Sequence, residues 1–316
     1  MKKRPVEIYA GRELAAYGFP DSHPFGLTRH DAFMNRVQQD KVLSKIPIHK
    51  PVMGTFDQLK LFHTETYIRF VENKSAQGSG YLDGGDTPVF PRVFESASYV
   101  VGSAVDAAER IMKGEIDRAF IPIAGLHHAR RDRASGFCVF NDCGVVIEHL
   151  LQNHGLKNVA YVDIDAHHGD GVFYGFESDP RVIFADIHES GRYLFPGTGS
   201  AGETGLGQAK GRKLNIEMNP EDADEEFFAA WSKVLEFIEK SKPEFILLQC
   251  GADSVVGDPL THLRYSAGAH TRAALDLVNL ANTYCGGKML AVGGGGYNLS
   301  NLQNAWTGVV HSLLGE

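Results

Sequence analysis

Residues 159–171 decide the fold class of this chain. They read Val159-Ala160-Tyr161-Val162-Asp163-Ile164-Asp165-Ala166-His167-His168-Gly169-Asp170-Gly171. The stretch begins with a short apolar run, which predicts a strand buried on both faces of a sheet. It ends in acids, histidines and glycines, and parallel sheets bind their ligands beyond the carboxyl ends of the strands. We therefore predict a buried parallel strand that ends at a functional site.

The rest of the chain alternates short β-branched runs with longer segments of helical period. We expect strands at Ala119–Ala124, Val159–Ile164, Val182–Ala185, Phe245–Gln249 and Met289–Val292. We expect helices at Val93–Lys113, Gly144–Asn153, Glu225–Lys240, Ala267–Asn282 and from Leu299 onward, with Gly155 as a C-cap. This alternation is typical of βαβ units and predicts an α/β fold with helices on both faces of a parallel sheet.

Polar side chains follow the other four predicted strands as well. In chain order these strands run into His127-His128, Asp186-Ile187-His188, Asp253 and Gly293-Gly294-Gly295-Gly296-Tyr297. The carboxyl ends of parallel strands meet at one edge of a sheet, so we expect these segments to converge on one site. Core packing does not account for such a convergence.

The composition indicates one domain, residues 1–316. The 316 residues are 43% hydrophobic and 22% charged, and no linker or charge block divides them. The net charge of −8 argues against a nucleic-acid partner, which needs a basic face. No apolar run approaches the ~20 residues of a membrane span, and the N-terminus lacks a signal-peptide core. We therefore expect a cytoplasmic protein. We also expect Ser75–Gly85 to form a glycine-rich surface loop.

The four cysteines show no metal or redox spacing. Cys138, Cys143, Cys250 and Cys285 lie in or beside apolar or glycine-rich runs. We expect them to be small buried residues in a reducing compartment rather than ligands or disulfides.

Asp165 and His167 are the first candidate metal ligands. They are two residues apart, so on an extended segment their side chains leave on the same side. Asp253 is the natural third ligand. A three-ligand oxygen and nitrogen set leaves one position for water, which suits Zn²⁺ or another divalent first-row ion such as Fe²⁺. The alternative is that such aspartates only cap the following helices.

His127 and His128 favour a different role. Adjacent residues on an extended segment point to opposite faces, so the two rings seldom bind one metal. We interpret them as acid–base groups, with Asp163 and Asp170 available to orient their far nitrogens. The alternative is a hydrogen-bonded turn.

Tyr297 follows four glycines, which let the backbone approach another element closely. No Lys-Ser/Thr pair follows, which argues against a phosphate-binding loop. A tyrosine hydroxyl at a strand tip can donate a hydrogen bond to a developing oxyanion. The alternative is a tyrosine that covers the core.

Taken together, these segments resemble histone deacetylases. The resemblance rests on motifs that occur in the family's order along nearly the whole chain: His23-Pro24, Arg29, Gly125–Ala129, Ser135–Asp142, Asp163–Gly171, Phe195–Gly199, Gly251–Asp253, Gly257–Pro259 and Gly293–Asn298. It implies the arginase/deacetylase fold, a single α/β domain around an eight-stranded parallel sheet, in a bacterial-type member of the family.

The resemblance also implies a role for each site residue. Asp165, His167 and Asp253 would hold zinc. His128 with Asp170 would be the general base and later the general acid. His127 with Asp163 would be its electrostatic neighbour. Tyr297 would stabilise the oxyanion, and the Gly136 carbonyl would accept a hydrogen bond from the substrate N–H.

Four further residues resemble the family's substrate channel. Phe137 resembles one aromatic wall, and Leu194 takes the place where many members have the second, which predicts a wider channel. Leu260 resembles an apolar residue near the channel mouth. Asp86 resembles a rim acid that binds a peptide backbone.

A structural potassium ion is also implied by the resemblance. The family binds it near the Asp163 and Asp165 carbonyls, His167 and a Ser-Leu/Ile-His segment. Here that segment is Asp186-Ile187-His188. The Asp186 side chain either strengthens the binding of the cation through its extra negative charge or turns outward.

These observations predict a zinc-dependent deacetylase that frees an amine such as lysine from its acyl group, with homo-oligomers allowed. One alternative is an acetylpolyamine or other small-amide deacetylase on the same fold. A two-manganese arginase is disfavoured because His127-His128 and Tyr297 stand where it would need other groups. A third alternative, from another class, is a non-catalytic acyl-ligand binding module.

Overall fold

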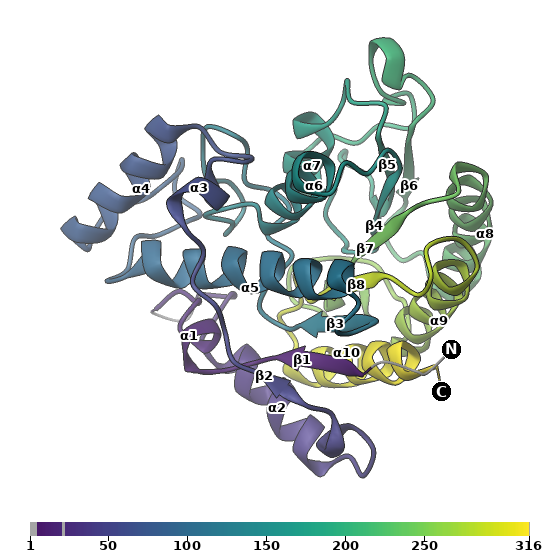
Figure 1. Ribbon diagram of the computed structural model, residues 1–316, viewed down its shortest axis with the longest axis horizontal. Helices are drawn as coiled ribbons and strands as arrows, with labels where there is room; N and C mark the ends of the chain where they lie inside the picture. Colours follow the sequence, from purple (N-terminus) through teal and green to yellow (C-terminus); the bar gives the residue numbers. More distant parts are fainter. Residues whose placement is uncertain (1–4, 21–22, 316) are drawn as a thin grey trace.

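Eight parallel strands form one sheet in the computed structural model, which describes residues 5–20 and 23–315. The ends of the predicted domain, residues 1–4 and 316, lie outside the described residues. The strand order is β2-β1-β3-β8-β7-β4-β5-β6 (Figure 1). The strands are β1 (Val6–Tyr9), β2 (Ile48–His49), β3 (Arg118–Ile121), β4 (Val159–Asp163), β5 (Val182–Glu189), β6 (Lys213–Met218), β7 (Phe245–Gln249) and β8 (Met289–Val292).

The five predicted strands are confirmed as β3, β4, β5, β7 and β8, which stand side by side in the middle of the sheet. β7 and β8 have the predicted bounds, and β4 ends one residue earlier than expected. β3 ends at Ile121 rather than Ala124, because Pro122 has no N–H to continue the ladder.

β5 is longer than predicted and includes Asp186-Ile187-His188, which we expected to follow the strand. The longer strand is explained by β6, which was not among the predicted strands. β6 pairs with β5 from Phe184 to Glu189 and so keeps the backbone extended beyond Ala185.

The five predicted helices are confirmed with ends shifted by at most two residues. The helices are α1 (Arg12–Ala15), α2 (Thr28–Gln39), α3 (Phe56–Leu59), α4 (Glu65–Gln77), α5 (Val93–Lys113), α6 (Asp142–Asn153), α7 (Asp170–Gly175), α8 (Asp224–Ser241), α9 (Ala267–Tyr284) and α10 (Leu299–Leu314). Short 3₁₀ turns lie at Leu43–Lys45, Gly207–Ala209 and Ala252–Ser254. Gly155 follows α6 with φ 67°, as a C-terminal glycine should. The predicted loop 75–85 begins only at Gly78, because α4 continues through Gln77.

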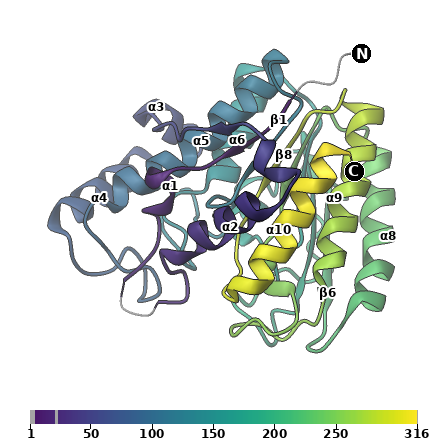
Figure 2. The same ribbon diagram turned by 90° about the horizontal axis from the view of Figure 1, so that it is seen from below.

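Alternate residues of the central strands enter two separate cores. Val159 and Tyr161 of β4 pack with α5 and α6 on one face, and Ala160 and Val162 pack with α8, α9 and α10 on the other. Figures 1 and 2 show these helices on opposite sides of the sheet. The central strands are therefore apolar on both sides, and their carboxyl ends are the place where polar groups can gather.

All four cysteines are buried, as predicted, and the structure joins none of them in a disulfide. Within the described residues, no helix has both the length and the apolar character needed to cross a membrane.

Helix α5 packs closely on the segment 52–54, where Gly54 N donates to Ser98 O at 2.8 Å. Gly102 makes this approach possible, because a Cβ there would overlap Gly54 N and Val52 O. Both neighbours are backbone atoms, so neither can move aside cheaply.

We expect Gly102→Ala to lower the free energy of unfolding by about 1–3 kcal/mol through overpacking. Chemical denaturation measures this change. Gly84→Ala is the control, because a Cβ at Gly84 has no atom within 4 Å. Equal stability of the two variants would contradict the packing argument.

Candidate active site

The predicted catalytic and metal-binding residues meet at the carboxyl ends of β3, β4, β7 and β8. All eight are at least half-buried, and all except Tyr297 are 8% exposed or less. They come from loops far apart in the chain, as the parallel topology requires. These residues are His127, His128, Asp163, Asp165, His167, Asp170, Asp253 and Tyr297.

Asp165, His167 and Asp253 form one group with ligand atoms near a common point. His167 Nδ1 lies 3.1 Å from Asp165 Oδ1 and 3.0 Å from Asp253 Oδ2. One imidazole thus faces two buried carboxylates. A nitrogen and two carboxylate oxygens are a donor set that suits a divalent transition ion.

Protons occupy this group when no ion does. Burial alone would lower the pKa of His167, but its bonds to Asp165 and Asp253 raise that pKa to about 10. Burial and the charge of Asp165 raise the pKa of Asp253 to about 7. The two carboxylates therefore hold more negative charge than one imidazolium balances, which favours a cation of higher charge at this point.

The backbone around the group orients the two carboxylates. Gly295 N and Gln249 Nε2 both donate to Asp165 Oδ2 at 2.8 Å, and Ala166 N donates to Asp253 Oδ1 at 2.9 Å. A Cβ at Gly295 would overlap the Asp253 carboxylate. The glycine run before Tyr297 therefore serves this close approach.

His127 and His128 each have the aspartate partner that we predicted. His127 Nδ1 lies 2.8 Å from Asp163 Oδ2, and His128 Nδ1 lies 2.7 Å from Asp170 Oδ1. The two Nε2 atoms face each other at 3.1 Å. One of these nitrogens must donate and the other accept, so the two rings differ in protonation.

The surrounding charges decide which ring carries the extra proton. Burial alone would lower the pKa of His127, but the charges of Asp163 and Asp165 raise it to about 10. Burial and the neighbouring His127 charge lower the pKa of His128 to about 4, against the pull of Asp170. His128 is therefore neutral near pH 7 with an Nε2 lone pair, as a general base must be.

Two supporting residues escaped the sequence analysis. Arg130 donates from Nε and Nη2 to Asp170 Oδ2 at 3.0 and 2.7 Å, and Tyr161 Oη donates to Asp163 Oδ2 at 2.5 Å. Arg130 thus holds the aspartate that orients His128, and Tyr161 holds the aspartate that orients His127. A signal for Arg130 existed, since it stands two residues after His128.

A pocket of about 230 Å³ opens onto these groups, and all five predicted substrate-binding residues line it. Its lining is Asp86, His128, Gly136, Phe137, His167, Leu194, Phe195, Leu260 and Tyr297. The Tyr297 ring meets the Phe137 ring edge-on at 6.0 Å between centroids. The pocket thus joins an apolar wall to the acid–base and metal-binding groups.

Phe195 is the lining residue that we had not assigned. We expected Leu194 to leave one wall without an aromatic ring, but both Leu194 and Phe195 line the pocket. The Phe195 ring stands edge-on to His128, with centroids 5.0 Å apart. The pocket therefore has aromatic rings from Phe137 and Phe195, and the wider channel expected from Leu194 stays a prediction.

Asp186 turns inward and is fully buried. Its Oδ1 lies 2.7 Å from His188 Nδ1, and its Oδ2 accepts from Gly169 N at 2.8 Å. His188 Nε2 lies 2.9 Å from Gly199 O, so both ring nitrogens face acceptors. Burial alone would lower the pKa of His188, but Asp186 raises it. The extra acid is thus balanced by an imidazolium of the same strand.

This pair should stabilise the fold in a pH-dependent way. A histidine with a raised folded-state pKa contributes fully below its ordinary pKa of about 6.5 and loses that contribution as the pH rises through the raised value. We expect Asp186→Asn to lower the free energy of unfolding by about 3–5 kcal/mol in mildly acidic buffer, and by less at alkaline pH. Denaturation at several pH values measures the difference. Glu236→Gln, in an exposed pair, is the control and should show no such trend.

The eight-stranded parallel sheet and the buried histidine–aspartate set at its strand ends define the arginase/deacetylase fold. The chain belongs to the histone deacetylase family, whose domain model matches residues 23–313. This membership indicates a deacetylase and confirms the resemblance drawn from the sequence.

Three relatives illustrate the match. The chain is 38% identical over 294 residues to the acetoin utilization protein AcuC of Bacillus subtilis (strain 168), covering 90% of this chain and 75% of that protein. It is 32% identical over 323 residues to the histone deacetylase clr6 of Schizosaccharomyces pombe, covering 99% and 78%. The crystal structure of the HDA15 HD domain superposes with a TM-score of 0.91 at 27% identity, covering 99% of this chain and 89% of that one. The bacterial relatives support a bacterial-type member.

Proposed function

We propose that this chain is a zinc-dependent deacetylase that hydrolyses the acyl amide of a lysine side chain or a similar amine to a free amine and a carboxylic acid. The observation that carries the proposal is the pocket, where the neutral His128, Tyr297 and His167 line one small space. Family membership and the AcuC and clr6 relatives support the class of reaction.

Asp165, His167 and Asp253 would hold the metal ion. A bound divalent ion supplies Lewis-acid polarisation of the amide carbonyl and of the attacking water. The one-nitrogen, two-oxygen donor set accepts Zn²⁺ and also Fe²⁺, and we propose Zn²⁺.

His128 performs the proton transfers. Its Nε2 takes a proton from the water that attacks the acyl carbon, and later returns a proton to the leaving nitrogen. Asp170 accepts a hydrogen bond from Nδ1–H and holds the ring in the tautomer whose Nε2 carries no proton. Burial alone would raise the pKa of Asp170, but the hydrogen bond from His128 and then the charge of Arg130 lower it, so this carboxylate stays ionised.

The pocket wall positions the substrate. Phe137 and Phe195 enclose the apolar stem of the acylated amine, and Leu194 and Leu260 complete the apolar lining. Tyr297 donates its hydroxyl hydrogen to the developing oxyanion, and the Gly136 carbonyl accepts from the amide N–H. His127, held by Asp163, supplies a fixed positive charge beside the base.

Several finer assignments stay predictions. They are the binding of a peptide backbone by the exposed Asp86, a structural potassium ion near Asp163 and Asp186, a homo-oligomer, and the lack of a nucleic-acid partner. A cytoplasmic location is supported by four cysteines that are all free.

Tyr297→Phe should lower kcat by ~10²–10³ while leaving KM nearly unchanged, because the hydroxyl acts on the transition state. Steady-state kinetics on an acetyl-lysine peptide measure both constants. Tyr284→Phe removes an exposed hydroxyl that binds Glu239 and is the matched control. A Tyr297→Phe enzyme with wild-type kcat would remove the oxyanion role.

Asp253→Ala should abolish turnover of every acyl substrate, because two ligands do not hold the ion in place. We would compare it with the wild type on acetyl-lysine peptides and acetylpolyamines in parallel. The ratio of the wild-type kcat/KM for acetyl-lysine peptides to that for acetylpolyamines identifies the preferred substrate class. Binding of both without hydrolysis by metal-loaded wild type would support the non-catalytic alternative instead.

Treatment with a chelator should remove the activity, and Zn²⁺ should restore it. Readdition of Zn²⁺, Fe²⁺ and Mg²⁺ to the apoprotein compares the candidate ions, and Mg²⁺ should fail because it prefers oxygen ligands. Full activity after exhaustive chelation would contradict the metal assignment.

A further inference from the structure

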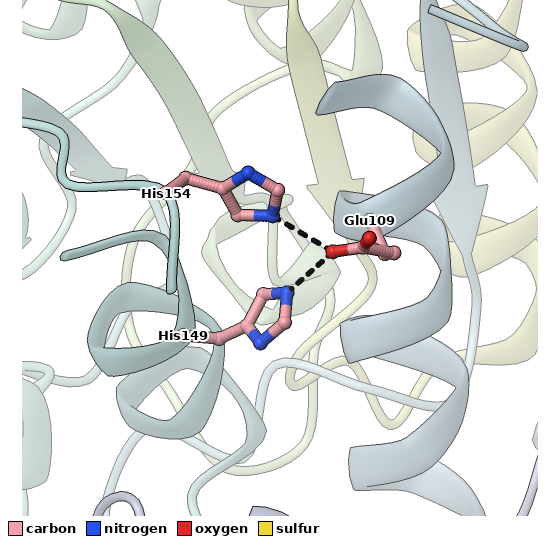
Figure 3. A group of neighbouring side chains, drawn as sticks. All are labelled: Glu109, His149 and His154. Atoms are coloured by element: carbon pink, nitrogen blue, oxygen red, sulfur yellow. Dashed lines mark hydrogen bonds and ion pairs between the residues drawn. The ribbon is translucent and has the colours of Figure 1, made fainter. Parts of the chain in front are cut away.

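A second group of potential ligands lies between helices α5 and α6. Glu109 comes from α5, His149 from α6, and His154 from the C-cap of α6. Figure 3 shows the three side chains pointing toward one another. Glu109 Oε2 lies 3.0 Å from His149 Nε2 and 2.7 Å from His154 Nε2. None of these residues lines the pocket of the candidate active site.

One carboxylate oxygen thus faces two imidazole nitrogens, and the three ligand atoms lie within 4.8 Å of one another. The side chains of His149, His154 and Glu109 are 9%, 21% and 29% exposed. They are held firmly enough to keep their geometry and open enough for an ion to enter. Lys113 binds the other oxygen, Oε1, at 3.2 Å and leaves Oε2 to the histidines.

The surroundings supply what a metal site needs beyond three ligands. Asn153 Nδ2 lies 2.9 Å from His149 Nδ1, and rotation of the Asn153 amide would let it accept from Nδ1–H instead. That exchange frees His149 Nε2 for a metal while the far nitrogen stays bonded. A hollow of about 360 Å³, lined by all three ligands and by Asn153, leaves room for water ligands.

We propose that Glu109, His149 and His154 form a second metal site, which binds a divalent transition ion such as Zn²⁺ and links α5 to the end of α6. Two imidazoles exclude Mg²⁺ and Ca²⁺ as the preferred ions, since both favour oxygen ligands. The inference does not rest on the proposed deacetylase function. It also means that two ions per chain do not imply a two-metal active site.

Metal content of the full-length protein tests the proposal. Protein is incubated with excess Zn²⁺, desalted and analysed for zinc per chain. We expect His154→Ala to carry one zinc fewer than the wild type, with unchanged deacetylase activity. Asn153→Ala should retain the site with about tenfold weaker Zn²⁺ affinity, as for other residues that orient a ligand.

Controls separate the site from nonspecific binding by histidine. His311→Ala is the matched variant, because His311 pairs with Asp40 at 3.1 Å but belongs to no three-ligand group among the described residues. It should keep the wild-type zinc content. The Glu109→Gln side chain still accepts hydrogen bonds from both histidines but lacks the negative charge, so we expect this variant also to carry one zinc fewer. It tests the proposal if His154→Ala does not fold.

Thermal unfolding provides a second readout. Added Zn²⁺ should raise the Tm of the Asp253→Ala variant, whose active-site group is broken, and should not raise that of the Asp253→Ala/His154→Ala double variant. Equal zinc content of wild type, His154→Ala and Glu109→Gln, or equal Tm responses of the two Asp253→Ala proteins, would overturn the proposal.

Discussion

The structure depends on the compensation of negative charge that is buried at the ends of the central strands. Five aspartates, Asp163, Asp165, Asp170, Asp186 and Asp253, are at most 2% exposed. An unpaired carboxylate in such a place is strongly unfavourable, so each needs a cationic partner. Asp163 and Asp186 each face a histidine whose pKa is raised. Asp170 faces the Arg130 guanidinium as well as the neutral His128, whereas Asp165 and Asp253 share one histidine. The shared histidine marks the point where a divalent ion would balance the charge better than one proton.

The backbone makes this arrangement possible. Parallel strands covered by helices on both faces leave their carboxyl ends as the place where backbone N–H groups can turn toward a buried acid. At Gly251 and Gly295 the backbone lies so close to these acids that a Cβ at either position would overlap an oxygen of Asp165 or Asp253. Asp165 and Asp253 each receive at least one hydrogen bond from the main chain, whose position the sheet determines. A site of this kind is oriented before any ligand arrives.

The sequence predicts the centre of the molecule better than its margins. The five predicted strands are buried on both faces, so they appear as continuous apolar runs. The edge strand β6 alternates buried and partly exposed residues, and β2 has only two residues, so neither carries a clear signal. The same holds at the site. Clustered acids and histidines can be recognised in the sequence. Gln249 and Phe195 act through tertiary contacts that no local pattern encodes.

Gly136 allows two rings to approach the pocket closely. Gly136 has φ 52°, and a Cβ there would lie 2.6 Å from the His128 ring and 2.8 Å from the Phe195 ring. Only a glycine allows both rings to close on the pocket. Two aromatic walls stabilise any apolar stem by its buried area, about 25 cal/mol per Å², and do not distinguish lysine from a polyamine. Discrimination must therefore arise at the mouth. Under the proposed function, an exposed acid of the pocket lining such as Asp86 would attract the additional charges of a polyamine and would also accept hydrogen bonds from a peptide backbone.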